Sequence, residues 1–174
     1  MNRLFFYPDY RRYVLFTTPA LNHIYSRLQR WVWQKESGGE LFAVDPASHG
    51  LIITIAKGPA REDCRARHAF NPDIVAAHRE RLLQYDLGLH AIGLWHTHPE
   101  RYPRPSGLDQ RTTEAYLEAF MGDRTRYLMV ILGNHGAPPN MQVWSVSRSE
   151  QSKWIALLEV AQTLRYPIPA MTRF

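Results

Sequence analysis

Two histidines stand two positions apart in the sequence His96-Thr-His98-Pro. They follow an apolar run from Leu89 to Trp95 that predicts a strand, and residues two apart on a strand point to the same face. Both imidazoles could therefore bind one metal ion. Asp109 comes early in the next predicted helix and could supply a third ligand. Two nitrogens and one oxygen suit zinc with an open fourth position, where a water molecule is acidified to a pKa of about 7.

A zinc hydrolase also needs a carboxylate that moves a proton from the water to the leaving nitrogen. Glu36 is the candidate, because Gly38 and Gly39 after it allow a sharp turn and a close approach to a neighbouring strand. Glu40 competes with it, but Glu40 could equally be a solvent-facing residue of the following strand. Ser106 could donate a hydrogen bond to the oxyanion of a tetrahedral intermediate.

Each candidate has an alternative without chemistry. Ser106 could be a helix N-cap, with Asp109 an acidic residue favoured by the helix dipole. Either histidine alone could be a hydrogen-bonded interior residue, and Glu36 alone could be a solvated helix end. The combination of these residue types in one closely spaced string favours a metal site.

The elements that must position these residues alternate between strands and helices. The apolar spacing predicts a first helix over 19–35, and Glu36 then lies at its end. Turn residues separate two runs that we expect to pair as antiparallel strands, and a charged loop follows over 58–67. Strands are predicted over 41–44, 51–57, 67–70, 89–95, 127–132 and 141–146. Two further helices are predicted over 71–88 and 106–121. The segment 150–160 could be helix or strand.

Length and composition exclude several classes of protein. With 174 residues, 45% of them hydrophobic, the chain predicts one domain over 1–174. One cysteine excludes a disulfide framework and a cysteine-rich zinc site. No apolar run reaches the roughly 18 residues that a membrane span needs, and Pro8 and Asp9 interrupt any signal peptide, so we expect a cytoplasmic protein. The net charge of +5 comes with dispersed arginines and no recognition motif, which argues against nucleic-acid binding.

Aromatic residues near the candidate site carry weaker expectations. Trp95 should point away from the face that the histidines use and pack in the core. Trp31 and Trp33 close the first predicted helix and should belong to the core or to a dimer surface. Tyr102, in the loop before Ser106, could line a substrate channel.

The string of candidate residues resembles the JAMM motif of the JAB/MPN metallopeptidases, which reads Glu, then His-x-His-Pro, then Ser-x-x-Asp. The matching residues are Glu36, then His96-Thr-His98-Pro, then Ser106-Gly-Leu-Asp109. The stretch Glu36-Ser-Gly-Gly-Glu-Leu-Phe-Ala is similar to the family's Glu-Thr-x-Gly-x-Leu-x-Gly, with alanine in place of the last glycine. The segments around 57–70 and 93–106 look like short bacterial JAB proteins of mobile-element and anti-phage operons, and the resemblance covers roughly 19–147.

The resemblance implies an α/β (α+β) fold of the cytidine-deaminase-like JAB/MPN type, with a curved mixed sheet and flanking helices. It also implies a zinc isopeptidase with one Zn²⁺ per chain. His96, His98 and Asp109 would hold the metal, Glu36 would act as base and then as acid, and Ser106 would stabilise the oxyanion. Some MPN domains are inactive scaffolds that lack the metal ligands, which is the alternative for this chain.

The substrate implied by the resemblance is a ubiquitin-like modifier, or a nucleotide-second-messenger synthase (CD-NTase), conjugated through its C-terminus. E1- and E2-like proteins of the same operon are the implied partners. The resemblance fits two settings. In CBASS the protein would remove the conjugated synthase, and in a Bil-type operon it would act beside a ubiquitin-like protein. We favour the first setting. The loop over 58–70 would form one wall of the groove for the substrate tail, where Arg65 and Arg67 could hold the conjugate.

Overall fold

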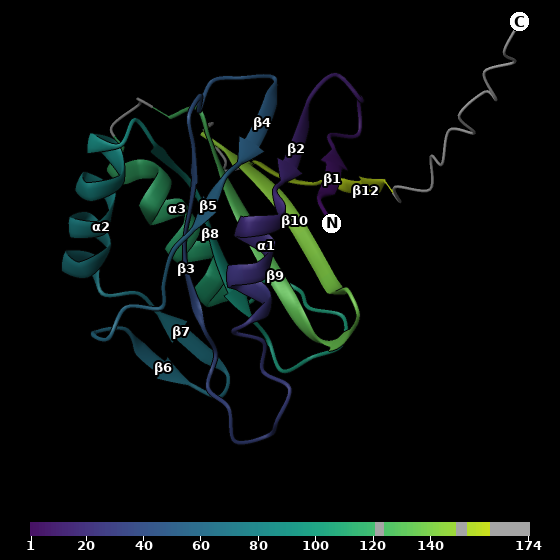
Figure 1. The fold of residues 1–174 in the computed structure, drawn as a ribbon, viewed down its shortest axis with the longest axis vertical. Coiled ribbons are helices and arrows are strands. Elements are labelled where there is room, and N and C mark those ends of the chain that lie inside the picture. The colour runs from purple at the N-terminus through teal and green to yellow at the C-terminus, as the bar shows by residue number, and fades with distance from the viewer. Residues whose placement is uncertain (121–123, 149–152, 161–174) are drawn as a thin grey trace, which may run out of the picture.

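A six-stranded mixed sheet runs through the centre of the protein (Figure 1). Its strand order is β11-β10-β9-β8-β3-β5, and β8 and β9 are parallel while the other neighbours are antiparallel. The computed structural model describes residues 1–120, 124–148 and 153–160. The strands are β3 (Gly38–Ala43), β5 (Ile55–Ala56), β8 (His90–Thr97), β9 (Arg126–Gly136), β10 (Pro139–Ser147) and β11 (Lys153–Ala156).

A second sheet of four strands, in the order β12-β1-β2-β4, packs against the first. Its strands are β1 (Arg3–Phe6), β2 (Tyr13–Phe16), β4 (Gly50–Ile53) and β12 (Leu158–Val160). The sequence expectation of one antiparallel pair is therefore half wrong. The run over 51–57 is divided, because β5 pairs antiparallel with β3 whereas β4 pairs parallel with β2. The N-terminal hairpin of β1 and β2 was not predicted.

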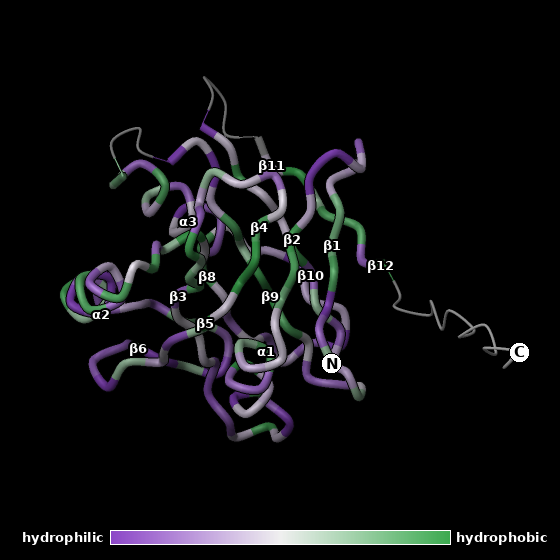
Figure 2. The backbone as a smooth tube through the Cα atoms, turned by 45° about the horizontal axis from the view of Figure 1, so that its top comes forward, coloured by the Kyte–Doolittle hydropathy of each residue, from purple (hydrophilic) through white to green (hydrophobic). Residues whose placement is uncertain are grey.

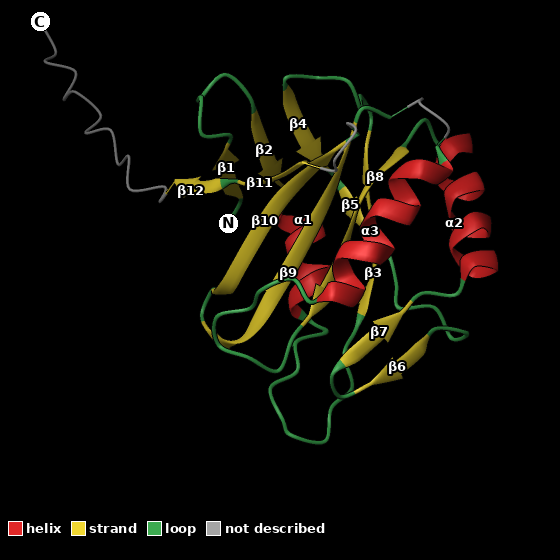
Figure 3. Ribbon diagram, turned by 180° about the vertical axis from the view of Figure 1, so that it is seen from behind, coloured by secondary structure: helices red, strands yellow, loops and turns green. Residues whose placement is uncertain are grey.

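Helices cover both faces of the large sheet. α1 (Thr18–Tyr25) buries Leu21 and Ile24 in a core shared by the two sheets, and Trp95 of β8 lies in that core as predicted. α3 (Gly107–Ala119) covers the opposite face, where Leu94 of β8 packs, and α2 (Ile74–Asp86) lies beside it (Figure 3). Hydrophobic residues concentrate in the central strands, while the surrounding loops are mostly hydrophilic (Figure 2). The mixed sheet with flanking helices confirms the predicted fold class.

The first helix is much shorter than the sequence predicts, since α1 ends at Tyr25 rather than at residue 35. Leu28 continues the apolar spacing but is buried from a loop. Next to it, the buried Gln29 amide donates hydrogen bonds to the carbonyl oxygens of Gln34 and Arg67 at 3.0 and 2.9 Å. Gln29 therefore folds the segment back on itself, and a loop rather than a helix end leads to Glu36.

The charged segment after β5 contains a separate two-stranded hairpin, β6 (Cys64–Ala66) with β7 (Ala69–Asn71). It stands apart from both larger sheets at one end of the molecule (Figure 1). The region that could be helix or strand forms β11 and β12, with 150–152 outside the described residues. Helix α3 ends at Ala119, and 121 also lies outside them. None of the described helices is long and apolar enough to cross a bilayer.

Candidate metal centre

The end of β8 fixes the two histidines of the candidate site. The Thr97 N–H between them donates to the Ser37 carbonyl oxygen at 2.8 Å, and the His98 N–H donates to Leu132 of β9, also at 2.8 Å. His96 and His98 are both buried, at 3% and 7% exposure. Their Nε2 atoms lie 2.9 Å apart, so the two imidazoles converge as the spacing predicts.

Helix α3 brings Asp109 to the same point. Ser106 is the N-cap of this helix, and its oxygen accepts from the Asp109 N–H at 3.2 Å, while the Asp109 carboxylate accepts from the Ser106 N–H at 2.6 Å. This reciprocal capping box orients the carboxylate. Asp109 oxygens lie 3.2 Å from Nε2 of His96 and 3.5 Å from Nε2 of His98. The capping alternative and the ligand hypothesis are therefore compatible, because one geometry serves both.

The three side chains fit a zinc ion. Zinc binds histidine nitrogen and carboxylate oxygen at about 2.0–2.2 Å with tetrahedral geometry, which separates any two ligand atoms by about 3.3 Å. The two Nε2 atoms lie 2.9 Å apart, Oδ1 of Asp109 lies 3.2 Å from Nε2 of His96, and Oδ2 of Asp109 lies 3.5 Å from Nε2 of His98. The donor set and these distances are therefore compatible with a metal ion such as zinc.

The electrostatics of the cluster favour a charged Asp109. Burial raises the pKa of this carboxyl, but hydrogen bonds from His96, His98 and Ser106 outweigh burial and hold the pKa well below its usual range. Burial also dominates at His96, whose pKa is lowered despite the contact with Asp109. Burial opposes the charge of His98 too, yet Asp109 and Glu36 together raise its pKa. The carboxylate of Asp109 and a neutral imidazole at His96 suit a cation, whereas His98 would release a proton on binding one.

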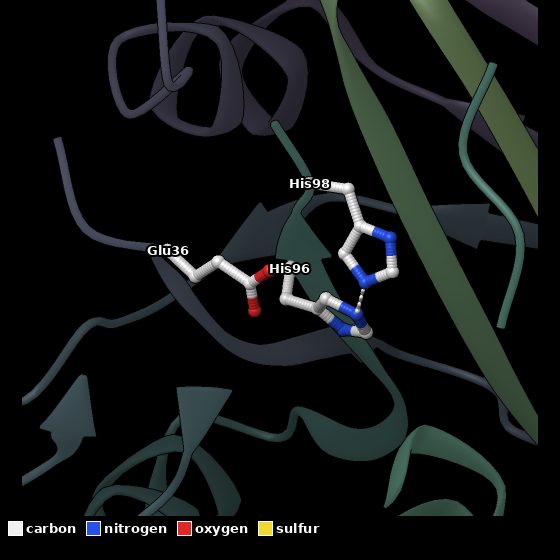
Figure 4. Close-up of side chains that lie close together, drawn as sticks. All are labelled: Glu36, His96 and His98. Atoms are coloured by element: carbon white, nitrogen blue, oxygen red, sulfur yellow. Dashed lines mark hydrogen bonds between the residues drawn. The ribbon is translucent and has the colours of Figure 1, made fainter. Parts of the chain in front are cut away.

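Glu36 lies at this cluster, two residues before β3 begins. It offers an oxygen within 4.8 Å of ligand atoms on His96 and His98, and Figure 4 shows its carboxylate beside the two imidazoles. Its side chain is 3% exposed, so the alternative of a solvated helix end is wrong. Burial raises the pKa of Glu36 to about 7, with opposition from His98 and support from the charges of Asp109 and Glu100. Such a value suits a group that accepts and releases a proton near neutral pH.

Glu40, the competing carboxylate, belongs to another network. Its Oε1 lies 3.2 Å from Nε of Arg81 on α2 and accepts from the Tyr127 hydroxyl at 3.3 Å. Glu40 is buried, so the alternative of a solvent-facing strand residue is wrong. The structure places Glu36, rather than Glu40, beside the histidines.

The two glycines between these carboxylates allow close packing of β3. A Cβ at Gly39 would overlap the carbonyl oxygen of Lys57, and a Cβ at Gly38 would lie 2.5 Å from the Phe70 ring. The predicted close approach is therefore confirmed.

Several expectations around the site need correction. Trp31 and Trp33 are 60% and 73% exposed and stack on each other, with ring centroids 5.4 Å apart, so they are not core residues. Tyr102 is exposed on the loop before α3, and its role in lining a substrate channel stays a prediction. Arg65, expected to face the substrate, donates instead to the Glu36 carbonyl oxygen at 2.6 Å. Sequence reasoning missed this contact, because a charged loop gives no signal of which main-chain group an arginine will bind.

Comparison with known proteins agrees with the geometry. Two curated proteins, both named CD-NTase/cGAS isopeptidase, are similar to this chain. The one from Escherichia coli (strain TW11681) is 32% identical over 113 residues, which cover 63% of this chain and 71% of its own. The one from Pseudomonas aeruginosa (strain BWHPSA011 / Pa011) is 30% identical over 130 residues, covering 73% and 81%.

A solved structure and a family model complete the comparison. Protein DSY2949 from Desulfitobacterium hafniense matches 80% of this chain and 87% of its own, with a TM-score of 0.51 and 14% identity, which supports the fold alone. Residues 18–147 match the family model described as prokaryotic homologs of the JAB domain, and this range contains every residue of the candidate centre. The chain therefore belongs to the family of prokaryotic JAB-domain proteins.

Proposed function

We propose that the chain is a zinc-dependent isopeptidase. The observation that carries the proposal is the convergence of His96, His98 and Asp109 within 3.5 Å of one another, with the buried Glu36 carboxylate beside them. Three ligands and one adjacent unligated carboxylate are the arrangement that metal-assisted amide hydrolysis requires. The names of the relatives support the isopeptidase class of hydrolase.

In this proposal the three ligand side chains hold Zn²⁺. When bound, zinc supplies Lewis acidity, which lowers the pKa of a water molecule and polarises the substrate carbonyl. Asp109 neutralises part of the cation's charge, and the capping box with Ser106 keeps its carboxylate turned towards the histidines. The inactive-scaffold alternative requires that this ligand set be lost, whereas each residue type is present here.

Glu36 moves the protons. Its carboxylate removes a proton from the water, and the water oxygen bonds to the carbonyl carbon of the amide. When the C–N bond of this tetrahedral intermediate breaks, Glu36 gives the proton to the leaving amine nitrogen. Burial raises the pKa of Glu36 to about 7, which favours uptake of a proton by this carboxylate. The oxygen of Ser106 already accepts from the Asp109 N–H, which leaves its hydroxyl hydrogen to donate to the oxyanion.

The proposed substrate is an amide at the C-terminus of a conjugated protein. The relatives are named for CD-NTase/cGAS substrates, which favours a CD-NTase tail over a ubiquitin-like modifier. Such a tail is extended and would lie beside the β6–β7 hairpin, whose edge can add main-chain hydrogen bonds to it. E1- and E2-like proteins that form the conjugate are the proposed partners, and the reaction is placed in the cytoplasm.

The test uses two conjugates, a CD-NTase and a ubiquitin-like protein, each joined through its C-terminus to a lysine of a reporter. Intact-mass spectrometry follows cleavage by the wild-type protein and by Glu36→Gln, and zinc content is measured on both. We expect cleavage of the CD-NTase conjugate, about one zinc per chain in both proteins, and loss of cleavage in the variant. Zinc binding without cleavage of either conjugate would contradict the isopeptidase proposal, and absence of zinc would favour a scaffold.

A further inference from the structure

The β6–β7 hairpin holds the main chain of Glu36 at both of its polar groups. The Glu36 N–H donates to the Ala66 carbonyl oxygen at 2.8 Å, and Nε of Arg65 donates to the Glu36 carbonyl oxygen at 2.6 Å. Glu36 is outside the regular pairing of β3, which begins two residues later. The hairpin therefore supplies the hydrogen bonds that a continued strand would otherwise give to this residue.

Arg65 makes a second contact one residue further along. Its Nη2 donates to the Ser37 hydroxyl oxygen at 2.5 Å, so the guanidinium spans Glu36 and Ser37 as a fork. Ser37 is itself bound to Thr97, the residue between the two histidines. One connected series of hydrogen bonds thus runs from the hairpin through the Glu36 main chain to the end of β8.

Few other contacts tie this hairpin to the site. In the described part of the chain, β6 and β7 pair with each other and with neither larger sheet. The Phe70 ring lies over Gly38, and the Gln29 amide binds the Arg67 carbonyl oxygen. Two of the five N–H donors of the Arg65 guanidinium bind Glu36 and Ser37, which fixes the orientation of this group against them.

We infer that Arg65 is a positioning residue, through which the β6–β7 hairpin sets the place of the Glu36 carboxylate beside the histidines. The inference rests on the proposed function, since it assigns Glu36 the proton transfers. A substrate tail that docks on the hairpin would then act on the same element that places the base. Small displacements of a catalytic group are costly, because a 1 Å error lowers rates by about 100-fold.

Arg67 provides a matched control on the same hairpin. It is exposed, and its side chain makes no hydrogen bond or ion pair among the described residues. If arginines here simply held the substrate, Arg65→Ala and Arg67→Ala would both raise KM. If Arg65 positions Glu36, Arg65→Ala lowers kcat, whereas any effect of Arg67→Ala is on KM.

The experiment measures kcat and KM for Arg65→Ala, Arg65→Lys and Arg67→Ala on the CD-NTase conjugate, with zinc content and Tm as controls. For Arg65→Ala we expect kcat to fall about 10- to 100-fold with KM within about threefold of the wild-type value. Arg65→Lys should recover part of kcat, because an ammonium can reach one of the two acceptors but cannot form the fork. Arg67→Ala removes a side chain that could hold the conjugate, so any change should appear in KM while kcat stays at the wild-type value.

Hydrogen exchange of the Glu36 amide gives a readout that does not depend on activity. We expect faster exchange in Arg65→Ala than in the wild type or Arg67→Ala, since the hairpin that accepts this N–H loses its tether. If Arg65→Ala does not fold, Ser37→Ala, which removes one acceptor of the fork, should show the same changes to a smaller extent.

Unchanged kcat with raised KM in Arg65→Ala, or unchanged amide exchange, would overturn the inference. Failure of the wild-type protein to cleave the conjugate would instead contradict the proposed function. The exchange experiment would still decide whether Arg65 holds Glu36.

Discussion

Ser37 and Thr97 are joined by two hydrogen bonds across the ends of neighbouring strands. The Thr97 N–H donates to the Ser37 carbonyl oxygen at 2.8 Å, and the Ser37 N–H donates to the Thr97 hydroxyl oxygen at 3.0 Å. Thr97 separates His96 from His98, and Ser37 follows Glu36. This pair therefore fixes the position of the proposed base relative to two of the proposed ligands, although Ser37 and Thr97 are 60 positions apart in the sequence.

Asp109→Asn should remove the metal site. An amide is neutral and offers one oxygen, so the variant loses both the charge that attracts the cation and an acceptor for the Ser106 N–H. We expect zinc affinity, measured by calorimetric titration, to fall more than about 100-fold, beyond what loss of an outer partner costs. Added zinc should raise the Tm of the wild type but not of this variant.

Asp73→Asn is the matched control for that substitution. Asp73 also starts a helix, as the N-cap of α2, where its side chain accepts from the Ala76 N–H at 2.8 Å. Asparagine caps helices about as well as aspartate, so zinc affinity and Tm should both stay close to wild type. Equal zinc affinity in the Asp109 and Asp73 variants would contradict the assignment of Asp109 as a ligand.

Ser106 combines a structural role with a proposed catalytic one, and two substitutions separate them. Glycine is tolerated at an N-cap at a cost of only a few tenths of a kcal/mol, but it lacks the hydroxyl. We expect Ser106→Gly to keep its Tm within a few degrees while kcat on the conjugate falls about 100-fold or more. Ser106→Thr retains a hydroxyl and should recover much of the rate, whereas equal rates in both variants would argue against the oxyanion role.

The motif residues could be recognised from sequence because their chemistry depends on local spacing. His96 and His98 share a strand face, and Asp109 lies three positions after the N-cap Ser106, within the first turn of the helix. Both relationships are set by the periodicity of a single element. The family resemblance supplied the partner that spacing alone left open, namely Glu36 rather than Glu40.

What the sequence did not predict depends on contacts between distant segments. The helical spacing continues past Tyr25, yet Gln29 finds acceptors at Gln34 and Arg67, and these bonds favour a loop. The contact of Arg65 with Glu36 likewise joins two segments 29 residues apart. The strand pairing of β4 with β2 follows from a shared core between two sheets, which no local pattern encodes.

Glu40 should make folding stability depend on pH. Burial raises the pKa of this carboxyl from 4.5 to about 7, against the opposing effects of Arg81 and Tyr127. Between these values the folded protein retains a proton that the unfolded chain releases, so stability falls as pH rises from 4.5 to 7 and is then constant. The contribution lost is on the order of 3 kcal/mol.

Glu40→Gln is expected to remove that dependence. Urea unfolding at pH values between 4.5 and 8 gives the free energy of unfolding of the wild type and of the variant. As the pH rises, we expect this free energy to fall in the wild type relative to the variant. The attraction between Arg81 and the ionised carboxylate is already one of the effects that set the pKa of Glu40, so its loss follows the same pH dependence. Glu62→Gln, on the exposed surface, should run parallel to wild type. A parallel curve for Glu40→Gln as well would contradict the prediction.

Gly39→Ala should destabilise the whole protein, because it tests the close packing on which the position of β3 depends. An added Cβ at this position would overlap the carbonyl oxygen of Lys57, which is main chain and cannot move aside as a side-chain end could. Overpacking of this kind costs about 1–3 kcal/mol or more, so we expect a clear loss of the free energy of unfolding in urea.

Gly107→Ala is the control, since the nearest neighbour of its Cβ would be Nη1 of Arg111 at 3.4 Å and alanine favours the helix. Displacement of β3 should also lower zinc affinity in Gly39→Ala, since Gly39 pairs with Trp95 beside the first ligand. Unchanged stability and affinity would show that the crossing of β3 and Lys57 is less tight than the structure indicates.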